Sequence, residues 1–111
     1  MALEKQKREE QRKSQRKSTV ARCWLADGAV DRYTLLSDLS VSGARVATAG
    51  PPPVGCSIAL TFRLPESDAE VRASGRVVWR SEGFGGRGGV IGVEFGEVSE
   101  TRAIAAFVEL S

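Results

Sequence analysis

Beyond the first 18 residues, apolar and polar side chains alternate along short stretches that turn-forming residues separate. The stretch TVARCWLA places Val20, Arg22 and Trp24 on one side and Ala21, Cys23 and Leu25 on the other, as a half-buried strand does. The same alternation recurs down the chain. It predicts six strands, over residues 19–26, 30–38, 44–48, 56–64, 70–80 and 90–95.

The connections between these stretches carry ordinary turn and bulge signals. Asp27-Gly28 is a tight-turn pair, a run of three prolines cannot donate to a sheet ladder, and Gly75 marks a bulge or bend inside the fifth strand. Apolar residues then recur at helical spacing within about residues 98–110, with Ser99 placed to cap a helix. The pattern predicts an all-β fold with a C-terminal helix, a six-stranded antiparallel barrel.

Length and charge refine this picture. The chain has 111 residues, 41% of them hydrophobic, which suits one domain with one core. Residues 1–18 carry seven basic and three acidic side chains, whereas residues 19–111 carry nine basic and eleven acidic ones. A flexible basic segment ahead of a mildly acidic barrel favours an anionic partner met at that segment, and not a nucleic-acid polymer bound along the barrel.

Several classes of protein fit the sequence poorly. No apolar run is long enough for membrane insertion and no secretory leader is recognisable, so a cytoplasmic protein is expected. Cys23 and Cys56 lie far apart in apolar stretches, which favours buried free thiols over a disulfide. Without histidine, the chain offers no Cys/His metal site, and no metal or cofactor is expected.

Catalysis is also disfavoured. No nucleophile has a recognisable base partner, and no histidine is present to act as a general base. The glycine-rich GFGGRGG at residues 83–89 lacks the Lys-Ser/Thr pair of a phosphate-binding loop, so it is interpreted as a hairpin connection. The sequence therefore favours a binding protein over an enzyme.

Two short motifs carry the candidate chemistry. RKSQR contains Arg12-x-x-x-Arg16, and DLSVSG contains Asp38-x-Ser40-x-x-Gly43. Each motif alone is ordinary, because arginines four apart occur in charged segments and Asp, Ser and Gly are common turn residues. Their combination is specific, since 22 residues separate Arg16 from Asp38, which is the length of one hairpin.

In these motifs the chain resembles the PilZ domain family, bacterial receptors for the second messenger cyclic di-GMP. The resemblance continues through GRVVW at residues 75–79, IGVEF at residues 91–95 and the closing helix, and covers roughly residues 8–110. It implies a PilZ-like barrel and cyclic di-GMP as the ligand. It also implies signalling to an unidentified downstream protein, and a monomer or weak dimer is expected.

The resemblance also implies a role for each motif residue. Arg12 and Arg16 would contact phosphate and the O6/N7 edge of guanine, which suits a bidentate guanidinium. Asp38 would accept hydrogen bonds from the N–H groups of guanine. Ser40 would bond to the ligand or brace the loop, and Gly43 would let the backbone approach the ligand or adopt a positive φ.

Four further residues flank these positions, namely Arg8, Gln11, Trp79 and Arg80. Arg8-x-x-x-Arg12 also fits the first motif, but the pair Arg12 and Arg16 is favoured because it lies nearer the first strand. Gln11 directly precedes the motif, where family members vary. Trp79 is expected either in the core or beside the ligand.

Three functional hypotheses follow. The first is a switch, in which ligand binding draws the N-terminal segment over the barrel and alters a partner surface. The second is a PilZ-like adaptor of motility or pilus machinery that binds no nucleotide, which the presence of both motifs argues against. The third is a barrel for single-stranded nucleic acid, which needs a basic, aromatic-rich face that the sequence is not expected to provide.

Overall fold

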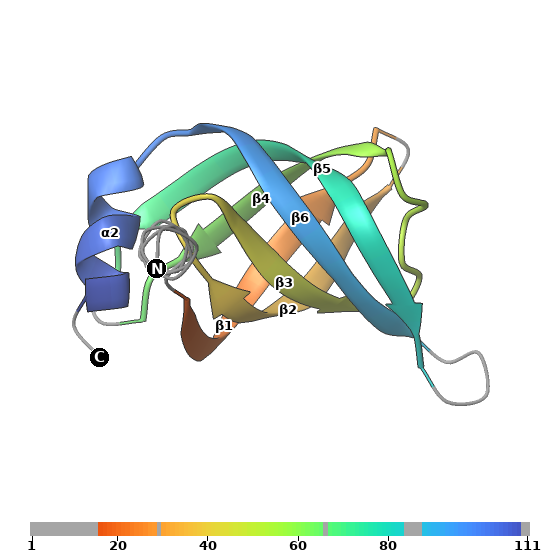
Figure 1. Cartoon of the computed structure of the whole chain (residues 1–111), viewed down its shortest axis with the longest axis horizontal. Helices are drawn as coiled ribbons and strands as arrows, with labels where there is room; N and C mark the ends of the chain where they lie inside the picture. The colour runs from red at the N-terminus through yellow and green to blue at the C-terminus, as the bar shows by residue number, and fades with distance from the viewer. Residues whose placement is uncertain (1–15, 29, 66, 84–87, 110–111) are drawn as a thin grey trace, which may run out of the picture.

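The computed structural model describes residues 16–28, 30–65, 67–83 and 88–109. Within them the elements are β1 (Lys17–Ala26), β2 (Asp31–Leu39), β3 (Gly43–Thr48), β4 (Ser57–Arg63), β5 (Glu70–Glu82), β6 (Gly89–Val98) and α2 (Thr101–Glu109). The strands close into an antiparallel barrel in the order β1-β2-β3-β6-β5-β4, and α2 lies at one end of it (Figure 1). The predicted fold is confirmed. The segment expected to be flexible lies, up to residue 15, outside the described residues.

Five of the six strands, all except β4, extend beyond a predicted limit. β1 begins at Lys17, which pairs with Leu39, and β5 continues until Glu82 pairs with Gly89. The end of β5 is exposed on both faces, so no alternation of apolar and polar side chains marks it, although its backbone pairing with β6 continues. Within the described residues, no helix has the length and apolar character needed to cross a bilayer.

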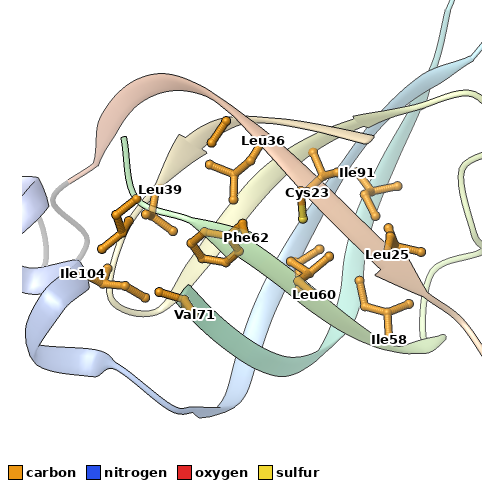
Figure 2. Close-up of a cluster of buried hydrophobic side chains, with 14 of the residues drawn as sticks. Cys23, Leu25, Leu36, Leu39, Ile58, Leu60, Phe62, Val71, Ile91 and Ile104 are labelled. Atoms are coloured by element: carbon orange, nitrogen blue, oxygen red, sulfur yellow. The ribbon is translucent and has the colours of Figure 1, made fainter. Parts of the chain in front are cut away.

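The core lies between the strands and consists of the inward positions of each one. Ala21, Cys23 and Leu25 of β1 are buried, as the alternation in TVARCWLA predicts. Figure 2 shows the β1 side chains meeting those of the other strands inside the barrel, while Ile104 of α2 lies at one end near Val71. Burying apolar side chains of this size stabilises the fold by about 1.5–3 kcal/mol each. The helix therefore completes the core at one end of the barrel.

The predicted irregularity at Gly75 is present. The register between β5 and β6 shifts between Ser74 and Gly75. A Cβ atom at Gly75 would collide with the backbone carbonyl oxygen of Glu94, so the two strands approach there too closely for any side chain.

The predicted cap of the helix is wrong. The Ile104 N–H donates to the Glu100 carbonyl at 3.2 Å, which makes Glu100 the capping position of α2. The Ser99 N–H donates to the Arg72 carbonyl, and the Ser99 hydroxyl accepts from the Arg72 N–H, both at 2.9 Å. Ser99 therefore continues the pairing with β5, one residue before the capping position of the helix.

The two cysteines differ in environment. Both thiols are free, but Cys23 is completely buried whereas Cys56 is only partly buried beside the proline turn. The prediction of a buried thiol is confirmed for Cys23 and is wrong for Cys56. Burial disfavours the thiolate and raises the pKa of Cys23 from 9.0 to about 11, against smaller opposing effects of hydrogen bonds.

The raised pKa of Cys23 predicts a loss of stability in alkaline solution. The unfolded chain loses this proton near pH 9 and the folded chain near pH 11, so the free energy of unfolding falls between these values. The expected loss is about 2–3 kcal/mol over that range. Urea unfolding of wild type, Cys23→Ala and Cys56→Ser at several alkaline pH values measures it. Cys23→Ala should flatten the pH dependence and Cys56→Ser should preserve it, and equal slopes in all three would contradict the prediction.

Candidate functional site

A pocket of about 370 Å³ lies on the outer surface of β3, β5 and β6, beside the loop that joins β2 to β3. Arg16, Asp38, Ser40 and Gly43 all line this pocket, and so does Trp79. The structure therefore brings together every described residue of the two motifs. The hairpin of β1 and β2 accounts for this, because Ser18 pairs directly with Asp38 in the barrel sheet.

The remaining candidate residues either lie outside the described residues or do not line the pocket. Arg8, Gln11 and Arg12 lie outside the described residues, so the choice between the two arginine pairs stays a prediction. Arg80 follows Trp79 in β5 but does not line the pocket, and its guanidinium forms an ion pair with the Glu82 carboxylate.

The Asp38 carboxylate has a different partner on each oxygen. Oδ1 accepts a hydrogen bond from the Ser18 hydroxyl at 3.1 Å, and Oδ2 lies 3.3 Å from the guanidinium of Arg45. An ionised carboxylate offers about four acceptor positions, so both oxygens can still accept hydrogen bonds from a ligand. Asp38 is thus held in place by β1 and β3 while it faces the pocket.

Arg45 and Trp79 form one wall of the pocket over the backbone of β6. In the sheet register, both residues are the neighbours of Gly92, Arg45 from β3 and Trp79 from β5. A Cβ atom at Gly92 would collide with the Trp79 indole, so this glycine allows the ring to lie across β6. The guanidinium carbon of Arg45 lies 5.4 Å from the centroid of the Trp79 ring, which is a cation–π distance.

Sequence reasoning missed Arg45. The alternation in GARVAT places Arg45 on the outer face together with Gly43, two residues earlier, and this signal marks it as a pocket candidate. Its neighbours in β6 and β5 follow only from strand pairing, which local patterns do not reveal. Among the described residues, the Arg45 Nε atom is buried without a hydrogen-bond partner.

The position of Trp79 resolves one open alternative. Trp79 is 37% exposed and lines the pocket, so it lies outside the barrel core. That Trp79 flanks a bound ligand stays a prediction.

Ser40 braces the loop between β2 and β3. Its hydroxyl oxygen accepts hydrogen bonds from the N–H groups of Ser42 at 3.3 Å and Gly43 at 3.1 Å. Its own N–H donates to the Gly43 carbonyl at 2.9 Å, and the residue is buried. These bonds fix the short turn that joins the end of β2, where Asp38 lies, to the start of β3. A direct bond from Ser40 to a ligand stays a prediction.

Gly43 is required by a neighbouring strand. It does not have a positive φ, so the prediction of a left-handed backbone there is wrong. A Cβ atom at Gly43 would collide with the carbonyl oxygen of Val93 in β6. The close approach allowed by this glycine is therefore that of β3 to β6, at the edge of the pocket.

The charges around the pocket are balanced within the described residues. Arg16 and Arg45 supply two guanidinium groups, and Asp38 and Glu94 supply two carboxylates. Glu94 also lies 3.9 Å from Arg76, outside the lining of the pocket. In the part of the chain that the structure describes, no cluster of three or more acidic or cysteine side chains is suited to hold a metal ion.

The chain belongs to the PilZ domain family, whose sequence pattern matches residues 6–110. This match includes both arginine pairs, the DLSVSG loop and the closing helix. No curated protein matches the chain in sequence.

Three solved structures have a similar fold. The inhibitor of motility MotI/DgrA from Bacillus subtilis aligns with a TM-score of 0.75 and 19% identity over 86% of this chain and 48% of its own. The PilZ domain of YcgR from Escherichia coli, solved with cyclic di-GMP, aligns with a TM-score of 0.66 and 15% identity over 86% of each chain. The PilZ domain of CeSA from a cellulose-synthesizing bacterium aligns with a TM-score of 0.55 and 19% identity over 86% of this chain and 92% of its own. The present chain thus spans about half of the length of the Bacillus protein.

Proposed function

We propose that the chain is a receptor for cyclic di-GMP, which binds in the pocket lined by Arg16, Asp38 and Trp79, and that it signals to a partner protein without catalysis. The observation that carries this proposal is the meeting of Arg16 with the Asp38–Gly43 loop in one pocket, across 22 residues of sequence. The E. coli YcgR domain with the same fold was solved with this nucleotide.

The groups of the pocket match the groups of the ligand. Guanine presents O6 and N7 acceptors on one edge, and a guanidinium such as that of Arg16 donates to both. The other guanine edge carries N–H donors, for which the free acceptor positions of Asp38 are suited. The ring of Trp79 and the guanidinium of Arg45 provide a surface against which a base stacks.

The charge balance of the pocket supports a role for Arg12. Cyclic di-GMP carries two phosphate charges, whereas the described lining has equal numbers of guanidinium and carboxylate groups. A net positive charge must then come from the chain that precedes Arg16, where Arg8 and Arg12 lie. In this account, binding draws that segment against the barrel, which is how the ligand changes the surface offered to a partner.

The two tryptophans provide an internal test of the site. On titration with cyclic di-GMP, we expect the indole N–H resonance of Trp79 to shift, because the base contacts that ring. The indole resonance of Trp24, which lies on β1 outside the pocket, should stay in place. A two-dimensional ¹H–¹⁵N spectrum measures both, together with the backbone amides of residues 8–18. A ligand that binds but leaves Trp79 and these amides unchanged would contradict both the site and the switch.

A second candidate is an adaptor that binds no nucleotide. The observation in its favour is that Asp38 already has two partners within the chain, Ser18 and Arg45. If these contacts serve only to hold β1, β2 and β3 together, the pocket has a structural purpose. Absence of any spectral change with cyclic di-GMP would favour this candidate.

A further inference from the structure

An apolar and basic surface covers the outer face of β1, β2 and β4, outside the nucleotide pocket. We call it the β1 face and define it by Val20, Arg22, Trp24, Tyr33 and Arg63, which line a hollow of about 640 Å³. The hollow shares no lining residue with the pocket of Arg16 and Asp38. The expectation of few exposed aromatic residues is therefore wrong.

The side chains of the β1 face are unusually exposed for their type. Val20 is 77% exposed, Trp24 55% and Tyr33 52%. Trp24 and Tyr33 are cross-strand neighbours, and their ring centroids lie 5.5 Å apart in an edge-to-face arrangement. The two rings therefore pack against each other on the outer face of the barrel. Leu35 extends the apolar surface, since it is 43% exposed and pairs with Arg22. Contiguous exposed apolar side chains of this kind mark interaction sites.

The charge of the β1 face is positive at its centre. Arg22 is exposed between Val20 and Trp24, and it makes no ion pair within the described residues. At the margin, Glu70 is shared between Arg63, at 3.5 Å, and Arg72, at 3.2 Å. An incoming group therefore meets an uncompensated guanidinium beside two aromatic rings.

We propose that the β1 face binds a partner protein through a segment in which carboxylate side chains flank an aromatic or aliphatic anchor. The anchor occupies the hollow between Trp24 and Arg63, and a carboxylate pairs with Arg22. Trp, Tyr and Arg are the residues that carry most binding energy in protein interfaces, and Val20 and Leu35 extend the contact. The proposal names the partner surface of the proposed receptor, but it rests on the β1 face alone.

Charge complementarity separates this occupant from the others. A second copy docked through the same face would bring two surfaces lined by Arg22 and Arg63 against only one carboxylate each, so like charges would meet. The N-terminal segment, with seven basic and three acidic residues, would be repelled as well. Single-stranded nucleic acid and anionic lipid need a denser set of cations, whereas Glu70 lies among the few arginines here. An acidic and apolar protein segment fits both the rings and the free guanidinium.

The test is a selection of peptides on the full chain. A phage-displayed library of random 12-residue peptides is selected on wild type. The selected peptides are synthesised and titrated into the labelled protein, which is followed by NMR. We expect sequences that combine Asp or Glu with Phe, Leu or Trp, that shift the Trp24 indole and leave Trp79 in place. Binding should weaken at least tenfold in Trp24→Ser and in Arg22→Glu. Val54→Ser, which changes an exposed valine outside the hollow, should bind as wild type does.

Every other outcome overturns the proposal. The β1 face is not a protein site of this kind if the selection yields no binders or if the selected peptides lack acidic residues. The same holds if the peptides bind the two variants as tightly as they bind wild type. Preferential binding of a dT15 oligonucleotide or of vesicles containing phosphatidylglycerol, lost in Trp24→Ser, would reassign it. A dimer in sedimentation that Trp24→Ser dissociates would assign it to self-association.

The result is independent of the nucleotide proposal. Cyclic di-GMP should bind Trp24→Ser with wild-type affinity, because the hollow and the pocket share no lining residue. If wild type fails to bind the nucleotide while the selected peptides still shift Trp24, the receptor proposal fails and the β1 face stands.

Discussion

Replacing Arg16 or Asp38 by alanine is expected to weaken cyclic di-GMP binding by about 1–3 kcal/mol each, or roughly 5- to 150-fold, through the loss of charge-assisted hydrogen bonds. Both residues line the pocket, and in the proposed complex their opposite charges would face opposite edges of guanine. Arg12→Ala should have an effect of the same size if Arg12 and Arg16 are the working pair. Isothermal titration calorimetry measures all three.

Matched variants separate this effect from a general change of charge. Arg102→Ala removes a guanidinium from the exposed side of α2, and Asp31→Ala removes a carboxylate from the opposite end of β2. Neither residue lines the pocket, so both variants should bind as wild type does. Equal affinities across the whole series would show that the site has been assigned to the wrong residues.

The Gly43→Val substitution is expected to damage both the fold and the pocket. Its side chain would collide with the backbone carbonyl of Val93, which belongs to a paired strand and cannot rotate away. Overpacking of this kind costs about 1–3 kcal/mol of unfolding free energy. Forcing β3 away from β6 also moves Arg45 relative to Trp79, so ligand binding should be lost in the fraction that remains folded. Urea unfolding and calorimetry measure the two effects.

Gly96→Ala is the control for this variant. A Cβ atom at Gly96 would meet Ser74 at 3.7 Å, an ordinary contact distance, although Gly96 lies in the same strand that Gly43 faces. We expect stability within about 1 kcal/mol of wild type, with unchanged ligand affinity. If Gly43→Val were as stable as Gly96→Ala, the close approach of β3 and β6 would not be what requires a glycine.

The barrel could be predicted from sequence because its strands are half-buried. The alternation of Ala21, Cys23 and Leu25 with outward side chains follows directly from the two-residue period of a strand. Boundaries were less certain where a strand is exposed on both faces, as at the end of β5. The cap of α2 was mispredicted because Ser99 is used by a strand distant in sequence, and tertiary pairing outweighs the local preference.

The site was predicted only as far as its motifs reach. Arg16, Asp38, Ser40 and Gly43 carry recognisable spacing, whereas Arg45 has none and enters the pocket through strand register. The sequence also does not reveal why position 43 is a glycine. The requirement comes from the close approach of β6, and not from the backbone angles of Gly43 itself. Strand pairing between distant segments is the information that periodicity lacks.

The exposed aromatic residues were missed for a related reason. In TVARCWLA the alternation groups Trp24 with Val20 and Arg22, but it does not show which side of the strand faces solvent. The structure follows the alternation, and Trp24 meets Tyr33 on the outer face of the barrel.

The receptor proposal is tested most directly by a calorimetric titration of the full chain with cyclic di-GMP, with cyclic di-AMP as the matched control. We expect saturable binding of the guanine nucleotide, strong discrimination against the adenine nucleotide, and loss of the heat signal in a variant that combines Arg16→Ala and Asp38→Ala. Adenine lacks the O6 acceptor and the N1–H donor that these residues would recognise. Absence of binding by wild type, or equal binding of both nucleotides by wild type and the double variant, would contradict it.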